Sequence, residues 1–307
     1  MAAFGCLAIG VRDVKPRYFR FWMAQVALAP AWLIVIFAYI GTILWTVQIS
    51  FTSSRVFPVS NYVGFSQYTR LFGSERWIIS VQNLAIFGLI FIVGCLILGF
   101  LLAVFLDQRI RAESMFRTIF LYPYALSFIV TGLVWQWTLN PTLGVQQTVR
   151  NWGWESFTFD WLSRGDRAIY VIALAGMWQA SGLVMAILLA GLRGVDGELW
   201  KAAKVDGIPT WRVYLHIVIP ILTPMFVTAT VLLATAVVKV YDLVVALTNG
   251  GPGISTEVPA KFVIEYLFQR QNLGLATAAS TVMMITVLCV LAPWLYMQYF
   301  RKPRSTH

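Results

Sequence analysis

The sequence predicts an all-α, polytopic membrane protein with six transmembrane helices. Of its 307 residues, 59% are hydrophobic and only 12% are charged, and the mean hydropathy is +0.74. A soluble domain of this length carries about twice that charged fraction. Six apolar stretches are each long enough to cross the hydrocarbon layer, which takes roughly 20 helical residues. The apolar excess is therefore expected to face lipid.

The predicted spans divide the chain into a cytoplasmic N-terminal segment (1–20), a membrane domain (21–300) and a cytoplasmic tail (301–307). The first and fifth spans exceed the minimum length and are expected to tilt or to project from the bilayer. The six spans are Phe21–Phe51, Trp77–Leu106, Met115–Leu139, Ala168–Leu192, Val213–Leu247 and Leu273–Phe300.

Lysine and arginine set the expected orientation. The side of the membrane that holds both termini carries 14 of the 23 Lys and Arg, the other side carries 8, and Lys239 lies within a span. Because cytoplasmic loops collect basic residues, both termini are expected in the cytoplasm. Residues 1–10 are apolar, but the basic cluster follows them, which is the reverse of a cleaved signal peptide and favours a cytoplasmic leader. Expected interfacial anchors are Tyr18, Trp22, Trp77, Trp294, Tyr296 and Tyr299.

Several classes of function fit poorly. The net charge of +10 is explained by the cytoplasmic loops, and no basic stripe interleaved with aromatics suggests nucleic acid. Cys95 and Cys289 lie in apolar spans, where a thiol packs as a small hydrophobe. No Cys or His spacing suggests a metal site. The extracytoplasmic segments 52–76, 140–167 and 248–272 are too short to fold as a catalytic domain.

The cytoplasmic segment 193–220 is the most informative part of the chain. Glu198–Asp206 is helix-compatible, with Leu199, Ala202 and Ala203 along one flank. Gly207 can take the positive φ that ends a helix, and Ile208 is biased away from helix by Pro209. Thr210 is expected to cap a second helix that begins at Trp211. The segment thus predicts two short helices joined by a sharp turn at the membrane face.

A helix of about nine residues is not stable alone in water, so this loop needs a partner. The loop either lies on the bilayer as an amphipathic segment or docks a soluble cytoplasmic subunit.

The loop resembles the EAA coupling motif of binding-protein-dependent ABC importer permeases, which reads Glu-Ala-Ala, three residues, Gly, nine residues and Ile-x-Leu-Pro. Here Lys201-Ala202-Ala203 is followed at that spacing by Gly207 and by Ile217-Val218-Ile219-Pro220, and Asp206-Gly207 resembles the form in sugar permeases. Lys201 stands where the family usually has Glu, and Ile219 where it has Leu. Glu198, one turn earlier, either supplies the acidic charge or pairs with Lys201.

A second resemblance narrows the family to carbohydrate permeases of the maltose type, in their F-like half. It is carried by Lys239-Val-Tyr-Asp242, Thr248-Asn-Gly-Gly-Pro-Gly253 and Thr256, with Leu28-Ala29-Pro30 and Asn83 as weaker echoes. The resemblance implies the type I importer permease fold in a bacterial inner membrane. It also implies a second homologous permease, two ATPase subunits and an extracytoplasmic solute-binding protein. ATP and Mg²⁺ are then bound by the ATPase, and this chain, which has no GxxxxGK[ST] loop, is expected to carry no cofactor and no catalytic residue.

Polar residues at membrane depth suggest a solute path, because such residues usually face the interior of the helix bundle. Aromatic rings beside amides suit sugars, whose CH faces stack while their hydroxyls take hydrogen bonds. Contacts between helices explain the same residues equally well, and Lys239 and Asp242 could pair with each other at i and i+3. The candidates are Asn83, Trp135, Gln136, Trp178, Gln179, Lys239, Tyr241 and Asp242.

Two other readings of the chain stay open. An ion-coupled secondary transporter or channel usually holds ionisable groups in mid-membrane, yet Asp107 and Asp242 lie near span ends. A polytopic membrane enzyme needs a carboxylate pair, a His cluster or an activated nucleophile inside the bundle, and the sequence suggests none.

Overall fold

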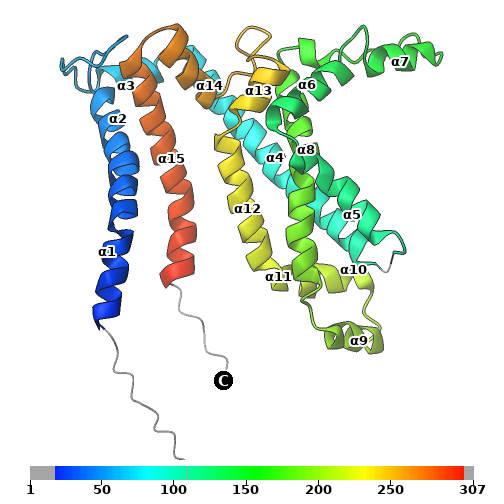
Figure 1. Cartoon of the computed structure of the whole chain (residues 1–307). Coiled ribbons are helices and arrows are strands. Elements are labelled where there is room, and N and C mark those ends of the chain that lie inside the picture. The colour runs from blue at the N-terminus through cyan, green and yellow to red at the C-terminus, as the bar shows by residue number, and fades with distance from the viewer. Residues whose placement is uncertain (1–17, 109, 301–307) are drawn as a thin grey trace, which may run out of the picture. The chain divides into compact units, whose positions relative to one another are not determined.

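The computed structural model describes residues 18–108 and 110–300, and these form helices joined by turns, with no β-sheet (Figure 1). The predicted leader and tail lie outside the described residues, as do the side chains of the predicted anchors Tyr18, Trp22, Trp294, Tyr296 and Tyr299. The α-helices are α1 Tyr18–Val35, α2 Thr42–Ser50, α3 Ser66–Phe72, α4 Glu75–Asp107, α5 Glu113–Leu121, α6 Phe128–Thr138, α7 Val145–Asn151, α8 Ala168–Leu192, α9 Gly197–Val205, α10 Thr210–Val213, α11 Ile219–Ile221, α12 Thr223–Val238, α13 Tyr241–Leu247, α14 Pro259–Ile264 and α15 Leu273–Phe300.

The chain divides into two compact units, residues 1–48 and 49–307. The first unit holds α1 and the start of α2, joined by a π-helical turn at Ile36–Gly41. Together they supply an apolar span, Leu28–Ser50, whose described side chains are exposed or half-buried as far as Gln48, while Ile49 and Ser50 are buried. The exposed apolar surface of such a helix must be covered by lipid or by another protein.

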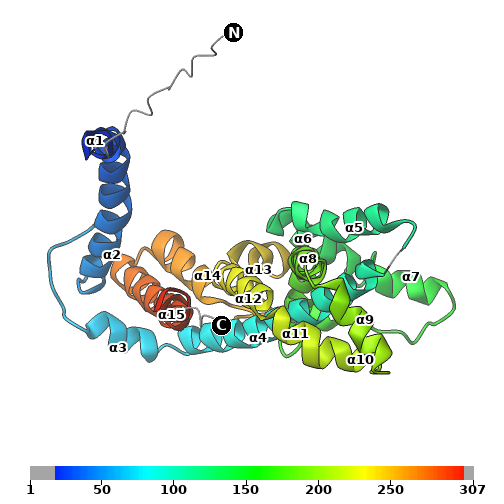
Figure 2. The same ribbon diagram turned by 90° about the horizontal axis from the view of Figure 1, so that it is seen from below.

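In the second unit, α4 packs along α8 to form the main core (Figures 1 and 2). Glycines on α4 allow the close approach: a Cβ on Gly99 would lie 2.6 Å from Val184 Cγ1, and one on Gly94 would lie 2.4 Å from Met177 Cε. Helix α8 has the predicted bounds and is the more deeply buried of the two. Helix α4 has 33 residues and is about 50 Å long, which exceeds the roughly 30 Å hydrocarbon layer.

The third predicted span is not one straight helix. Its two parts, Glu113–Ala125 and Phe128–Thr138, meet at a bend of 100°. Pro123 has no amide hydrogen to continue the helical ladder, and the chain runs extended through Leu126. Ser127 then restarts the helix, because its side chain accepts a hydrogen bond from the Val130 amide. The sequence prediction of a continuous span here is therefore wrong.

The fifth predicted span is also bent, by 69°, between Thr210–Ile221 and Thr223–Val238. Prolines at 220 and 224 flank the bend at Leu222. A second break at Lys239–Val240 separates α12 from α13. The first part of the predicted span thus belongs to the loop that follows α8, and α12 is the apolar helix proper.

Helix α15 has the bounds predicted for the sixth span, and its described apolar part is Leu273–Cys289. It shares a smaller core with α3, α4 and α14, built around Trp77, Phe262 and Leu275. Among the described residues, three helices are long and apolar enough to cross a membrane, or five if each bent pair forms one span.

Candidate functional site

The loop after α8 contains the two helices that the sequence predicts. Helix α9 begins after Asp196, whose carboxylate accepts a hydrogen bond from the Glu198 amide at 3.0 Å. Lys201 Nζ lies 3.3 Å from Glu198 Oε1, and both side chains are more than three-quarters exposed. An exposed pair of this kind contributes little to stability. Glu198 could supply the acidic charge of the motif or pair with Lys201, and in the structure it pairs with Lys201.

Helix α9 ends in a Schellman motif centred on Gly207. The φ of Gly207 is +68°, the Ile208 amide donates to the Ala203 carbonyl at 3.0 Å, and the Gly207 amide donates to the Lys204 carbonyl at 3.3 Å. The predicted turn is therefore confirmed. The predicted cap is wrong: Pro209 occupies the capping position of α10, without a side-chain hydrogen bond, and Thr210 is already the first helical residue.

An aromatic ladder joins the loop to the membrane helices. Trp200 of α9 packs edge-on against Tyr214, with ring centroids 5.2 Å apart. Tyr214 in turn contacts Phe100 of α4 at 6.3 Å, and Phe100 contacts Phe226 of α12 at 5.8 Å. Ala203 of α9 is buried as part of the main core. Direct ring contacts thus connect α9 to α4 and α12.

The loop also carries large apolar side chains that are exposed. Val205 is 87% exposed, and four further large apolar side chains of the loop are exposed in the described structure. They are Leu199, Ile208, Trp211 and Leu215. Exposed apolar surface gathered on one short loop marks an interaction site. Of the remaining predicted coupling residues, Ala202, Asp206 and Ile217 lie on the loop and Pro220 lies in α11, beside the bend.

Two of the predicted solute-path residues are used within the fold. Asn83 Nδ2 donates to the carbonyls of Ser255 and Glu257, at 2.8 and 2.9 Å, which ties α4 to the segment before α14. Gln179 Nε2 donates to the Leu126 carbonyl at 2.6 Å, at the break between α5 and α6. Its Oε1 is buried without a partner among the described residues.

The other path residues lie nearer the surface of the chain. Trp135 and Trp178 pack edge to face, 6.1 Å apart, with the exposed Gln136 beside them on α6. Lys239 and Asp242 are exposed at the break between α12 and α13, where the described structure forms no ion pair between them. Tyr241, between them, is half-buried. Of these path residues, Trp135 and Trp178 are the ones that the fold brings into contact.

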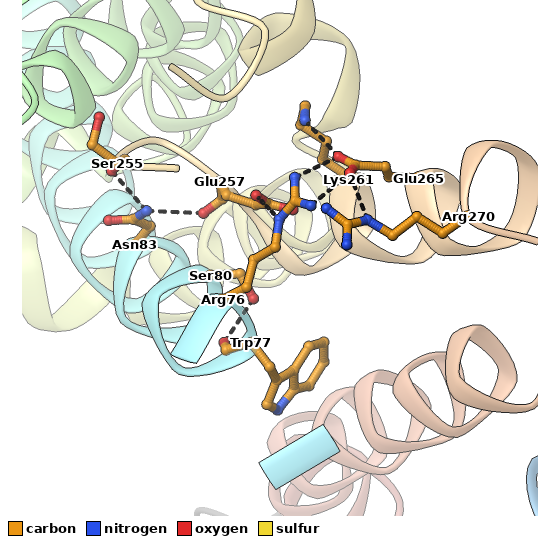
Figure 3. A network of polar contacts seen from close by, with 9 residues as sticks. All are labelled: Arg76, Trp77, Ser80, Asn83, Ser255, Glu257, Lys261, Glu265 and Arg270. Atoms are coloured by element: carbon orange, nitrogen blue, oxygen red, sulfur yellow. Dashed lines mark hydrogen bonds and ion pairs between the residues drawn. The ribbon is translucent and has the colours of Figure 1, made fainter. Parts of the chain in front are cut away.

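A charged network at the opposite end of the bundle is absent from the sequence predictions (Figure 3). Arg76 of α4 donates from Nε to Glu257 and from both terminal nitrogens to Glu265. Lys261 and Arg270 reach Glu265 from other sides, at 3.2 and 3.0 Å. Burial raises the pKa of Glu265, but the hydrogen bonds from Arg76, Arg270 and Lys261 outweigh it and hold that pKa at about 2. Because Arg76 and Glu265 are far apart in sequence, no local pattern indicates the pair.

The Gly-Gly-Pro turn, residues 250–252, lies against Lys261 of this network and is held by two threonine hydroxyls. The hydroxyls of Thr248 and Thr256 lie 2.8 Å apart, and Thr256 donates to the Gly251 carbonyl at 2.9 Å. Gly250 has a φ of +85°, which favours glycine, and a Cβ there would lie 2.9 Å from Lys261 Cε, so the Lys261 side chain would have to move.

Residues 96–304 match the family described as "Binding-protein-dependent transport system inner membrane component". The chain is 37% identical over 275 residues to a probable ABC transporter permease protein of Pyrococcus horikoshii, covering 89% of this chain and 94% of that one. It is 32% identical to a xylose/arabinose import permease protein of Haloferax volcanii, covering 88% of this chain and 87% of that one.

In fold the chain is similar to a solved bacterial ABC transporter involved in the import of the acidic polysaccharide alginate. The TM-score is 0.78 at 18% identity, covering 94% of this chain and 98% of that one. A second similar structure, with a TM-score of 0.77 at 20% identity, covering 92% of this chain and 95% of that one, is the alginate transporter in complex with a periplasmic protein that holds an alginate pentasaccharide.

Proposed function

Because the chain belongs to the family of binding-protein-dependent inner-membrane transport components, we propose that it is a permease subunit of an ATP-driven importer for a sugar or sugar-like solute. Its loop of α9 and α10 docks a separate ATPase. The observation that carries this coupling role is the loop itself, with its Schellman turn at Gly207 and its exposed apolar side chains.

The coupling follows from the contacts of the loop. ATP and Mg²⁺ bind to the partner ATPase and supply the hydrolysis, so this chain needs no catalytic group. Closure of the ATPase pair displaces α9, and the rings of Trp200, Tyr214 and Phe100 pass that displacement to α4 and α12. Two alternative packings of these helices would give the inward-open and outward-open states.

The proposed solute path runs beside Trp135 and Trp178, where ring faces and the Gln136 amide suit a sugar. Lys239 and Asp242, which are unpaired with each other at the break after α12, add polar contacts to this path. Several relatives are named as permeases for xylose or arabinose, sulfoquinovosyl glycerol, diacetylchitobiose, trehalose or maltose, and sn-glycerol-3-phosphate, and one for osmoprotective compounds. These names support a carbohydrate-like solute for this chain.

The full assembly includes a second homologous permease, a pair of ATPase subunits and an extracytoplasmic solute-binding protein. We place both termini on the cytoplasmic side of the inner membrane, which puts the α9–α10 loop in reach of the ATPase.

Uptake in membrane vesicles tests this function against an ion-coupled transporter. Uptake should require ATP and survive an uncoupler that collapses the ion gradients. The isolated chain in liposomes should neither hydrolyse ATP nor transport. Uptake that ignores ATP depletion but stops with the uncoupler would establish the ion-coupled alternative instead.

A further inference from the structure

The segment between α6 and α8 exposes several large apolar side chains. We call residues 139–161, with α7 at their centre, the α7 loop. Leu143 is 84% exposed, Trp152 82% and Trp154 60%, and Trp137, at the end of α6 just before the loop, is 72% exposed. Single exposed apolar residues need no explanation, but this many large ones within so short a segment do.

The exposure is not a sign of a poorly formed loop. Asn140 Oδ1 accepts hydrogen bonds from the amides of Thr142 and Leu143 at the entry to α7. Gln146 Oε1 accepts from the Phe159 amide at 2.7 Å, and Arg150 Nε donates to the Phe157 carbonyl at 2.8 Å. These bonds close the loop on itself. Trp152 and Trp154 are therefore exposed on a loop held by its own hydrogen bonds, although the Trp154 ring also contacts Phe157, with centroids 5.3 Å apart.

The place of the loop suggests what covers them. Helix α6 ends at Thr138 and α8 begins at Ala168, so the loop joins the ends of two apolar helices. In both ribbon views α7 runs sideways from α6 and α8, beyond the footprint of the helices around them (Figures 1 and 2). Because a helix that crosses the bilayer ends at the headgroup layer, a segment that runs sideways from such an end meets lipid headgroups.

We propose that the α7 loop lies in the headgroup region of the bilayer, with Trp137, Trp152 and Trp154 as its anchors. Tryptophan is the side chain most suited to this layer, because its ring is apolar while its N–H can bond to lipid carbonyls and phosphates. The charges between residues 140 and 167 balance, with three arginines against three carboxylates. Binding therefore depends on the aromatic rings and occurs on zwitterionic lipid. The assignment of this loop to the extracytoplasmic leaflet rests on the proposed orientation.

Lipid quenching tests the proposal on the full-length chain in phosphatidylcholine nanodiscs. Trp152→Cys or Trp154→Cys, in a background with Cys6, Cys95 and Cys289 replaced by Ala, carries an environment-sensitive fluorophore. The matched control is Val205→Cys, because Val205 is 87% exposed, close to the 82% of Trp152, but lies on α9. Lipids with a nitroxide at carbon 5 report the headgroup boundary, and iodide reports water. Because nanodiscs offer both leaflets alike, the result does not depend on the orientation or on transport.

We expect the nitroxide lipid to quench the fluorophore at 152 and 154 at least twofold more than at 205, and iodide to quench the one at 205 more. Quenching at 152 and 154 by iodide alone would place the loop in water and overturn the proposal. Protection from iodide that arises only when a solute-binding protein is added would also overturn it, in favour of a protein docking surface.

Discussion

Gly207 gives the sharpest test of the coupling loop, because its side-chain position is empty and only its backbone conformation is special. Its φ is +68°, and an added Cβ would meet nothing within 4 Å. Substitution by Ala therefore introduces no clash and changes only the cost of the left-handed conformation, roughly 1–2 kcal/mol. Gly207→Pro goes further, since proline fixes φ near −65° and removes the amide that bonds to Lys204.

The expected ranking of ATP-driven uptake follows from those costs. A loss of one or two kcal/mol lowers the ratio of docking-competent to incompetent loop about 5- to 30-fold. Gly207→Ala should therefore reduce uptake by at most that factor, while Gly207→Pro should abolish it. Gly207→Asn should retain more activity than Ala, because asparagine enters the left-handed region more readily.

The matched control is Gly197→Ala at the start of α9, where φ is not positive and the space is also open. It should transport like the wild type. Membrane insertion, followed by the amount of protein in washed membranes, should be unchanged in all four variants. Wild-type uptake by Gly207→Pro would refute the reasoning.

Three further predictions concern stability and packing. Because the pKa of Glu265 is depressed, its network stabilises the fold above about pH 4.5 and loses that contribution as the pH falls toward 2. Thermal unfolding in detergent should show this loss of stability, and Glu265→Gln should flatten the dependence of stability on pH. Asn83→Leu leaves the Ser255 carbonyl without its donor and should destabilise by about 2 kcal/mol, measured by denaturant titration. Gly182→Val should prevent native packing, because a Cβ there would lie 2.1 Å from the carbonyl oxygen of Phe120; thermal melting against Lys201→Ala, an exposed position expected within about 0.5 kcal/mol of the wild type, provides the comparison.

The sequence specifies the straight helices well. Continuous apolar runs gave the bounds of α8 and α15, and those of α4 to within two residues. The turn at Gly207 was also predictable, since the Gly-x-Pro order restricts the local backbone so strongly. These features depend on residues that are neighbours in the chain.

Features that depend on tertiary contacts were not predictable in the same way. Hydropathy averages over the bends near Pro123 and Leu222, so two kinked segments resembled single spans. Asn83 and Gln179 look like path residues in sequence, but each holds a distant backbone carbonyl. The partners of Arg76 lie at the other end of the chain.

The central claim is that the ATPase subunit docks on the α9–α10 loop. Crosslinking in cells tests this claim most directly. A photo-reactive amino acid placed at Leu199 or at Val205 probes exposed apolar positions of the loop, and one placed at Trp152 probes the far end of the bundle. The account predicts that positions 199 and 205 crosslink to the ATPase subunit and that position 152 does not. Crosslinks from 199 and 205 to lipid alone, with the assembled ATPase present, would contradict it.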